Sequence, residues 1–198
     1  MLVLVAGCKS QRASDNAAMG SDTSSGAMTT GAADTSSMAA GAQPGQPGAL
    51  SDANIVALLD EANMADSATG AYVVTRATNP EVKAFAKLMM GEHHAIHVQG
   101  LQVQKAQNIT PELPAQDPFK PAVEAEQAAL SSMPKGAAFD STYIAHEVGI
   151  HQAVIDWAGK NTPQNVAYQE YLKTAGPVYQ KHLDRALSLQ KSMSGTKP

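Results

Sequence analysis

The fold is decided by residues 79–99, which read NPEVKAFAKLMMGEHHAIHVQ. Asn79 is a good helix N-cap, and proline and an early acid are favoured in the first helical turn. Apolar residues then recur every three or four positions, as on the buried face of a helix. His93 falls near the centre of that face, where a solvated side chain is not expected. The stretch therefore predicts a helix from Pro80 to about 107 that carries an imidazole into a core.

The same periodicity predicts further helices over about 51–77, 120–132, 138–159 and 161–191. The last of them is expected to be kinked or interrupted at Gly176-Pro177. Short connections pair the four long helices into two antiparallel hairpins, and the long segment between the hairpins can cross the length of a bundle. We predict an all-α fold, namely a ferritin-like four-helix bundle with one long crossover that carries the short helix.

The N-terminal part differs in composition from the rest of the chain. Residues 2–8 are an apolar run that ends in Cys8, and Val5-Ala6-Gly7-Cys8 resembles the lipobox of bacterial lipoproteins. This resemblance implies cleavage before the cysteine and its acylation. The basic segment expected before such an apolar core is missing, which indicates a truncated or mis-assigned start. The alternative is an ordinary apolar N-terminus with an incidental cysteine.

The predicted organisation has four parts. Residues 1–8 are a truncated lipoprotein signal, residues 9–49 a disordered linker rich in Ser, Thr, Gly and Ala, residues 50–192 the bundle, and residues 193–198 a disordered tail. The expected location is the cell envelope, with the chain anchored to the outer membrane through Cys8 and the bundle facing the periplasm. Lys9 rather than Asp after the cysteine resembles the signal for outer-membrane rather than inner-membrane retention.

Charge and cysteine content exclude several function classes. The net charge of -4 and the lack of basic clusters give no reason to expect nucleic acid as a partner. A single cysteine allows no internal disulfide and no cysteine-based zinc site. No stretch approaches the roughly 20 apolar residues needed to span a bilayer.

Helical wheels place an acid or an imidazole on the inward face of every long helix. The inward candidates are Asp66, His93, Glu147, His151 and His182, with His97 at the flank. Such mixed ligands suit a divalent metal such as iron, manganese or zinc. The alternative is a metal-free buried network in which Asp66 accepts a hydrogen bond from His93. The residues alone leave both interpretations open.

Counting residues from the turns predicts the level of each side chain along the bundle. Asp66 and His93 differ by only about 4–5 Å and can meet, whereas His151 and His182 differ by about 16 Å. A longer loop, or a break at Gly176-Pro177, would reduce that mismatch. As counted, the levels do not predict one compact site shared by all four helices.

Four separated pieces of the chain resemble the DUF4142 family over about residues 51–192. They are residues 79–86, Met89 with Glu92-His93, Phe139-Asp140 with Tyr143 and His151, and Pro177 with His182-Leu183. The resemblance implies a ferritin-like fold in an exported or lipid-anchored bacterial protein with no established biochemical function. Asp66 stands where the family usually has glutamate.

The Glu-x-x-His motif of di-iron ferritin-like proteins is absent, because Met90, Val148 and Tyr179 stand three residues before the three histidines. Ferroxidase chemistry is therefore not carried over from the fold. Three hypotheses remain. The favoured one is a non-enzymatic envelope lipoprotein that binds a metal ion or small ligand. The others are a ferritin-type metal-dependent oxidoreductase and a structural or stress-response scaffold with a metal-free polar network.

Overall fold

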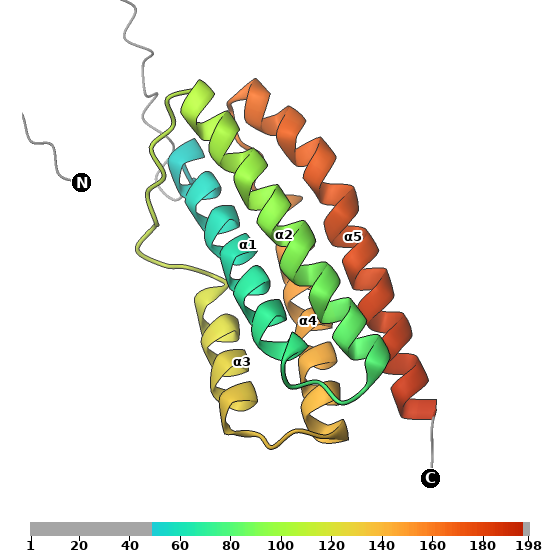
Figure 1. The fold of residues 1–198 in the computed structure, drawn as a ribbon. Helices are drawn as coiled ribbons and strands as arrows, with labels where there is room; N and C mark the ends of the chain where they lie inside the picture. Colours follow the sequence, from blue (N-terminus) through green and yellow to red (C-terminus); the bar gives the residue numbers. More distant parts are fainter. Residues whose placement is uncertain (1–48, 196–198) are drawn as a thin grey trace, which may run out of the picture. The chain divides into compact units, whose positions relative to one another are not determined.

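The computed structural model describes residues 49–195 and forms five helices in that part of the chain. They are α1 (Asp52–Val74), α2 (Pro80–Ala106), α3 (Lys120–Ser132), α4 (Ala137–Ala158) and α5 (Val166–Gly195). The four long helices α1, α2, α4 and α5 form a bundle, and the short helix α3 lies on its outside (Figure 1). The predicted all-α bundle with a helix in the crossover is confirmed, while its relation to ferritins stays a prediction. None of the described helices is both long and apolar enough to cross a membrane.

Polar side chains cap the N-termini of α1 and α2, the second of them at Asn79 as predicted. The Ser51 side chain accepts a hydrogen bond from the backbone N–H of Asn54, and the Asn54 side chain accepts one from the Ser51 N–H, which completes a capping box. The Asn79 side chain accepts a hydrogen bond of 2.8 Å from the Glu81 N–H, and Pro80 occupies the first turn of α2. These caps satisfy backbone donors that the first turn of a helix leaves free.

Helices α1 and α2 approach each other closely at Gly70. A Cβ atom at this position would lie 2.7 Å from the carbonyl oxygen of Ala86 and 2.8 Å from the backbone nitrogen of Met90. The Ser67 hydroxyl donates to the Met90 carbonyl at 2.9 Å on the same side. Only glycine permits this distance, which fixes the level of α1 against α2.

A buried acid ties the first hairpin to the second. Asp140, 1% exposed near the start of α4, accepts hydrogen bonds from the backbone N–H groups of Thr78 and Asn79 and from the Thr78 hydroxyl. The bonded groups belong to the turn between α1 and α2. These hydrogen bonds give a structural reason for Asp140 in the sequence motif.

The interior consists of two apolar clusters. One contains Leu58, Ile150 and Tyr168, and the other contains Phe85 and Phe139, each with neighbours from α1, α2, α4 and α5. Along each long helix, buried polar residues lie between the residues of one apolar cluster and those of the other. The bundle therefore has a polar layer at mid-height, and this layer holds the candidate site.

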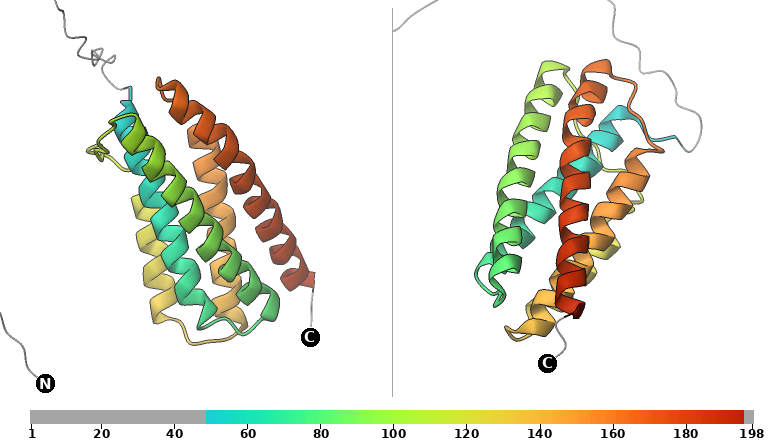
Figure 2. Two further views of the ribbon diagram at one scale, coloured as in Figure 1. Left: turned by 45° about the horizontal axis from the view of Figure 1, so that its top comes forward. Right: turned by 90° about the vertical axis from the view of Figure 1, so that its right-hand side faces the viewer.

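Some predicted helix ends are wrong. Helix α1 ends at Val74 rather than near 77, and α5 begins at Val166 rather than near 161. Helix α5 also runs unbroken through Pro177 and continues to Gly195, past its predicted end at 191. In both views of Figure 2, α5 begins farther along the bundle than α4 ends, so the connection rises between them. The predicted lipoprotein signal with its Cys8 anchor, and residues 9–48 of the predicted linker, lie outside the described residues.

Candidate metal centre

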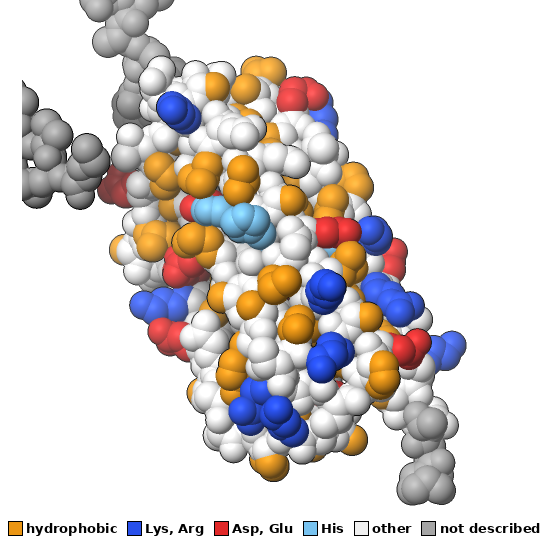
Figure 3. All heavy atoms as spheres, in the orientation of Figure 1, with side chains coloured by type: hydrophobic (Ala, Val, Ile, Leu, Met, Phe, Trp, Pro, Cys, Tyr) orange, Lys and Arg blue, Asp and Glu red, His pale blue; other side chains and the backbone are white. Residues whose placement is uncertain are grey.

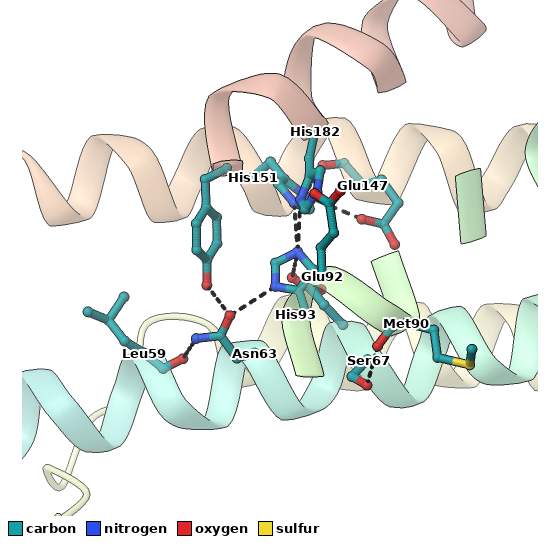
Figure 4. A network of polar contacts seen from close by, with 11 residues as sticks. Leu59, Asn63, Ser67, Met90, Glu92, His93, Glu147, His151 and His182 are labelled. Carbon is teal, nitrogen blue, oxygen red and sulfur yellow. Dashed lines mark hydrogen bonds and ion pairs between the residues drawn. The ribbon is translucent and has the colours of Figure 1, made fainter. Parts of the chain in front are cut away.

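Three histidines from three helices meet in the polar layer. His93 of α2, His151 of α4 and His182 of α5 are each 0% exposed, and one ring nitrogen of each lies within 4.8 Å of those of the other two. His93 Nε2 is 3.3 Å from His151 Nε2 and 3.1 Å from His182 Nδ1. Figure 4 shows His93 facing the other two rings across the centre of the bundle. We call these three residues the triad.

The triad overturns the level count for the second hairpin. The ring centroids of His151 and His182 lie 5.4 Å apart, not on levels about 16 Å apart. The count assumed a tight turn near residue 161. Because α5 begins farther along the bundle than α4 ends, His182 returns to the level of His151. No break at Gly176-Pro177 is involved, since α5 is continuous there.

The outer nitrogen of His93 faces a fixed acceptor. His93 Nδ1 lies 2.9 Å from Oδ1 of Asn63, which also accepts a hydrogen bond of 2.8 Å from the Tyr179 hydroxyl. The amide nitrogen of Asn63 donates to the Leu59 carbonyl at 2.7 Å, which sets the amide orientation. Oδ1 can only accept, so Nδ1 of His93 carries the proton. Its Nε2, which faces the other two rings, is left with a lone pair.

The same reasoning applies to the other two rings. His151 Nδ1 lies 2.9 Å from the Glu147 carbonyl oxygen, and His182 Nε2 lies 2.7 Å from the Glu92 carboxylate. Both partners are acceptors, so both of these nitrogens donate. The remaining nitrogens, Nε2 of His151 and Nδ1 of His182, point at Nε2 of His93. Outer hydrogen bonds of this kind fix the tautomer and orientation of histidines that bind metals.

Electrostatics keeps the triad neutral. Burial, followed by the charges of His151 and His182, holds the pKa of His93 well below its usual range. Burial and the neighbouring His182 lower the pKa of His151 to about 3. Burial also lowers the pKa of His182, although Glu92 opposes this. At neutral pH no proton is therefore expected between the three facing nitrogens.

Glu92 is the charged partner of the triad. Burial alone would raise its pKa, but the hydrogen bonds from His182 and Lys181 lower it below the ordinary value. Lys181 donates to the second carboxylate oxygen at 3.3 Å, and Glu92 is one-third exposed. An ionised Glu92 strengthens the hydrogen bond from His182 Nε2 and holds its proton on the outer side.

Asp66 lies at the edge of the triad, but not in the predicted contact. Its Oδ2 is 3.5 Å from His93 Nε2 and has no hydrogen-bond partner. In the metal-free alternative, Asp66 was to accept a hydrogen bond from His93. The structure lacks this bond, because His93 donates to Asn63 instead. Asp66 remains the acid nearest to the facing nitrogen of His93, while the group of described residues whose ligand atoms all lie within 4.8 Å of one another contains the triad alone.

Beside the triad lies a group of buried acids, which we call the carboxylate cluster: Asp66 of α1, Glu126 of α3 and Glu147 of α4. They are 3%, 3% and 0% exposed. Burial, then the charge of Glu126, raises the pKa of Asp66 well above its usual value. Burial, then Asp66 and Glu126, does the same for Glu147. Burial raises the pKa of Glu126 to about 7.

Several oxygens of this cluster lack hydrogen-bond partners. They are Asp66 Oδ2, Glu126 Oε1, both carboxylate oxygens of Glu147 and the Tyr143 hydroxyl. Glu147 Oε2 lies 3.3 Å from His151 Nδ1, but that N–H donates to the Glu147 carbonyl. Burial, then the neighbouring Glu147, raises the pKa of Tyr143 well above its usual value. Buried polar atoms without partners are rare in proteins.

The sixth candidate, His97, does not belong to the site. Its ring is half-buried and pairs with Asp60 on α1, one turn of α2 away from the triad. His94 is exposed, as its wheel position predicts. Figure 3 shows a patch of histidine on the molecular surface, to which the fully buried triad contributes nothing.

Sequence reasoning missed four residues that shape the site. Asn63, Glu92, Glu126 and Tyr179 were not among the predicted site residues. Asn63 lies on the same face of α1 as Ala62 and Asp66, three residues before Asp66, so the helical period could have found it. Glu126 had no such signal, because the short helix α3 has few buried positions to define a face.

Comparison with known proteins places the chain in a family. A family model described as a domain of unknown function (DUF4142) matches residues 35–189. The chain belongs to the DUF4142 family. The match includes the whole triad, and the resemblance predicted from the sequence motifs is thereby confirmed. No curated protein and no solved structure matches the chain.

Proposed function

We propose that this DUF4142 domain binds a divalent transition metal through His93 Nε2, His151 Nε2 and His182 Nδ1, with Asp66 as a fourth ligand. One observation carries the proposal: all three facing nitrogens present lone pairs, because every outer nitrogen donates to an acceptor. Three lone pairs in van der Waals contact repel one another unless a cation lies between them. A metal-free network would need a proton at this point, which the lowered pKa values of the triad oppose.

The distances support the same conclusion. A tetrahedral metal with bonds of about 2.0–2.1 Å to nitrogen places its ligand nitrogens about 3.3 Å apart. The two measured separations from His93 Nε2 are 3.1 and 3.3 Å. Three imidazoles and one carboxylate suit zinc or ferrous iron better than manganese, which prefers oxygen donors.

Burial favours a holding role over turnover. All three triad side chains are 0% exposed, and Asp66 is 3% exposed. A metal bound to four protein ligands in a closed core has the character of a structural or storage site, whereas catalytic metals keep a position open for substrate. The proposed role is therefore non-enzymatic metal binding, in preference to a ferritin-type oxidoreductase.

Zinc titration of the full chain, purified without a histidine tag, tests the proposal. We expect the wild type to bind zinc tightly at the triad and His151→Ala to lose at least about 1000-fold in affinity, because a ligand and its fixed lone pair are removed. The matched control is His97→Ala, which removes a histidine outside the triad and should bind as the wild type does. Equal zinc affinity in His151→Ala and the wild type would refute the proposal, as would a wild type that binds neither zinc nor ferrous iron.

We also propose that Cys8 anchors the protein to the outer membrane of the cell envelope, with the domain facing the periplasm. The support is the lipobox-like Val5-Ala6-Gly7-Cys8 followed by a polar linker composition. Fractionation of cells that express the protein, with mass spectrometry of residue 8, is the test. Acylation of Cys8, and release of the Cys8→Ser variant from membranes, are expected. An unmodified Cys8 in a membrane-free wild type would overturn the proposal.

A further inference from the structure

The short helix α3 leaves space along its contact with α1. It lies beside α1 on the outside of the bundle (Figure 1), and two cavities of about 350 and 240 Å³ are lined by residues of both helices. The larger cavity falls in the size range of sites for small molecules. No residue of the triad lines it. It is therefore a second place where the domain can hold a ligand.

Apolar side chains line much of the larger cavity. Leu58 and Ala62 of α1 and Phe119 at the start of α3 are buried there, and Val123 of α3 is partly buried. Met64 of α1 lines the same cavity and is 49% exposed, although it is a large apolar side chain. An alkyl chain in the cavity would remove these apolar surfaces from water, which favours binding.

The polar part of the lining has an excess of negative charge. It contains the acids Glu61, Asp117 and Glu124, against one cation, Lys120. Lys120 Nζ lies 3.9 Å from Glu124 Oε1, and both side chains are exposed. Glu61 and Asp117 have no ion-pair partner among the residues that the structure describes. The charge of these two acids therefore favours a cationic ligand.

Glu61 has an unpaired oxygen at this cavity. Its Oε2 is buried and has no hydrogen-bond partner. Burial, then the negative charge of Asp117, raises the pKa of Glu61 above its ordinary value. Asp117 is held in place by α3, because its Oδ1 accepts hydrogen bonds from the backbone N–H groups of Phe119 and Lys120 at 2.8 and 3.2 Å. An N–H donor that carries positive charge would satisfy Oε2 and offset the repulsion between the two acids.

We propose that the larger cavity between α1 and α3 binds a primary alkylamine, an amphiphile with an apolar chain and a protonated amino group. The chain packs against the apolar lining, and the ammonium group donates to Oε2 of Glu61 beside Asp117. Gln127 also lines the second cavity, together with Leu130, so a longer chain can continue along α3. An anionic amphiphile is repelled by the same two acids. The proposal is independent of the metal site and holds whether or not the triad binds an ion.

Calorimetric titration of the full chain with octylamine at neutral pH is the experiment, with octanoate and octanol as probes of the same chain length. We expect octylamine to bind at least about tenfold more tightly than either, because it alone brings a charged N–H donor. Glu61→Gln keeps the size of the side chain but removes its charge. This variant should bind octylamine at least about tenfold more weakly than the wild type, while its binding of octanol is unchanged.

The matched control is Glu112→Gln, because Glu112 is an exposed acid of the crossover that lines neither cavity. It should bind octylamine as the wild type does. Ala65→Leu tests the cavity itself, since the larger side chain fills space that Ala65 lines. Octylamine and octanol should both bind this variant at least about tenfold more weakly. Thermal melting establishes that each variant is folded before it is titrated.

Three results would overturn the proposal: a wild type that binds octylamine no more tightly than octanoate, a Glu61→Gln variant that binds octylamine as the wild type does, and an Ala65→Leu variant that keeps full binding. Zinc titration of the same wild-type sample separates this proposal from the proposed function. A protein that binds octylamine but no metal would refute the triad site alone. One that binds zinc but not octylamine would refute the amine site alone.

Discussion

The triad and the carboxylate cluster lie side by side in the same core but differ in how their polar atoms are satisfied. Each histidine of the triad has a hydrogen-bond acceptor on its outer side, so its protons are accounted for and only the inward lone pairs are unmatched. The acids of the cluster have oxygens with no partner at all. The first region is the one proposed to bind an ion, while leaving the oxygens of the second without partners costs stability.

The largest expected effect comes from His93→Ala, which removes the centre of the triad. His93 contacts both other rings and Asn63, so its loss should abolish tight zinc binding, a decrease of at least about 1000-fold. The cavity and the lost hydrogen bond should also destabilise the metal-free protein by about 2 kcal/mol. Zinc titration and thermal melting of the same sample measure both effects. An unchanged melt would contradict the packing described for this ring.

The next effect concerns the cluster and pH. The folded pKa of Glu126 is about 7, above its unfolded value of 4.5, so the folded state retains this proton longer. The free energy of unfolding of the metal-free protein should therefore fall as pH rises from about 4.5 to about 7, by roughly 2–3 kcal/mol from this residue. Urea unfolding across that range measures the slope. Glu126→Gln should be flatter than Glu124→Gln, and equal slopes would contradict the burial of Glu126.

A smaller effect is expected from Asn63→Ala, which leaves the triad intact but removes the acceptor for His93 Nδ1. The proton of His93 can then move to either nitrogen, so zinc affinity should fall by about 10–100-fold. Asn63→Asp, which restores an acceptor oxygen, should recover much of that loss. The zinc affinities of the two variants provide the comparison. If Asn63→Ala binds as the wild type does, the hydrogen bond does not set the tautomer.

The smallest effect should come from His94→Ala, next in sequence to His93 but on the exposed face of α2. Its ring takes no part in the triad, so stability should change by less than about 0.5 kcal/mol and zinc affinity should not change. Thermal melting and zinc titration, run in parallel with those of His93→Ala, measure the change in stability and in zinc affinity. A loss comparable to that of His93→Ala would mean that the inward face of α2 is wrongly assigned.

The helices and their inward faces were largely predictable, because a helical period over long segments assigns each residue to a face. His93, His151 and His182 were all expected to point inward, and they do. The level of His182 was not predictable, since it depends on how far the connection between α4 and α5 rises before Val166. Counting residues from the turn does not reveal how far this connection rises.

The partners inside the site were less predictable than its members. Asp66 was expected to bond His93, but two acceptors on α1 competed for one N–H group, and the side-chain geometry favours Asn63. Glu126 reaches the core from a short helix whose packing is decided by the crossover, not by its own period. Both outcomes depend on tertiary packing.

Anomalous diffraction from zinc-soaked crystals, recorded on both sides of the zinc edge, tests the central claim most directly. Three inward lone pairs predict one zinc peak in the core, about 2.0–2.1 Å from His93 Nε2, His151 Nε2 and His182 Nδ1. A core without a zinc peak, in which these nitrogens share protons or waters and zinc is found only at surface histidines such as His94, would contradict it.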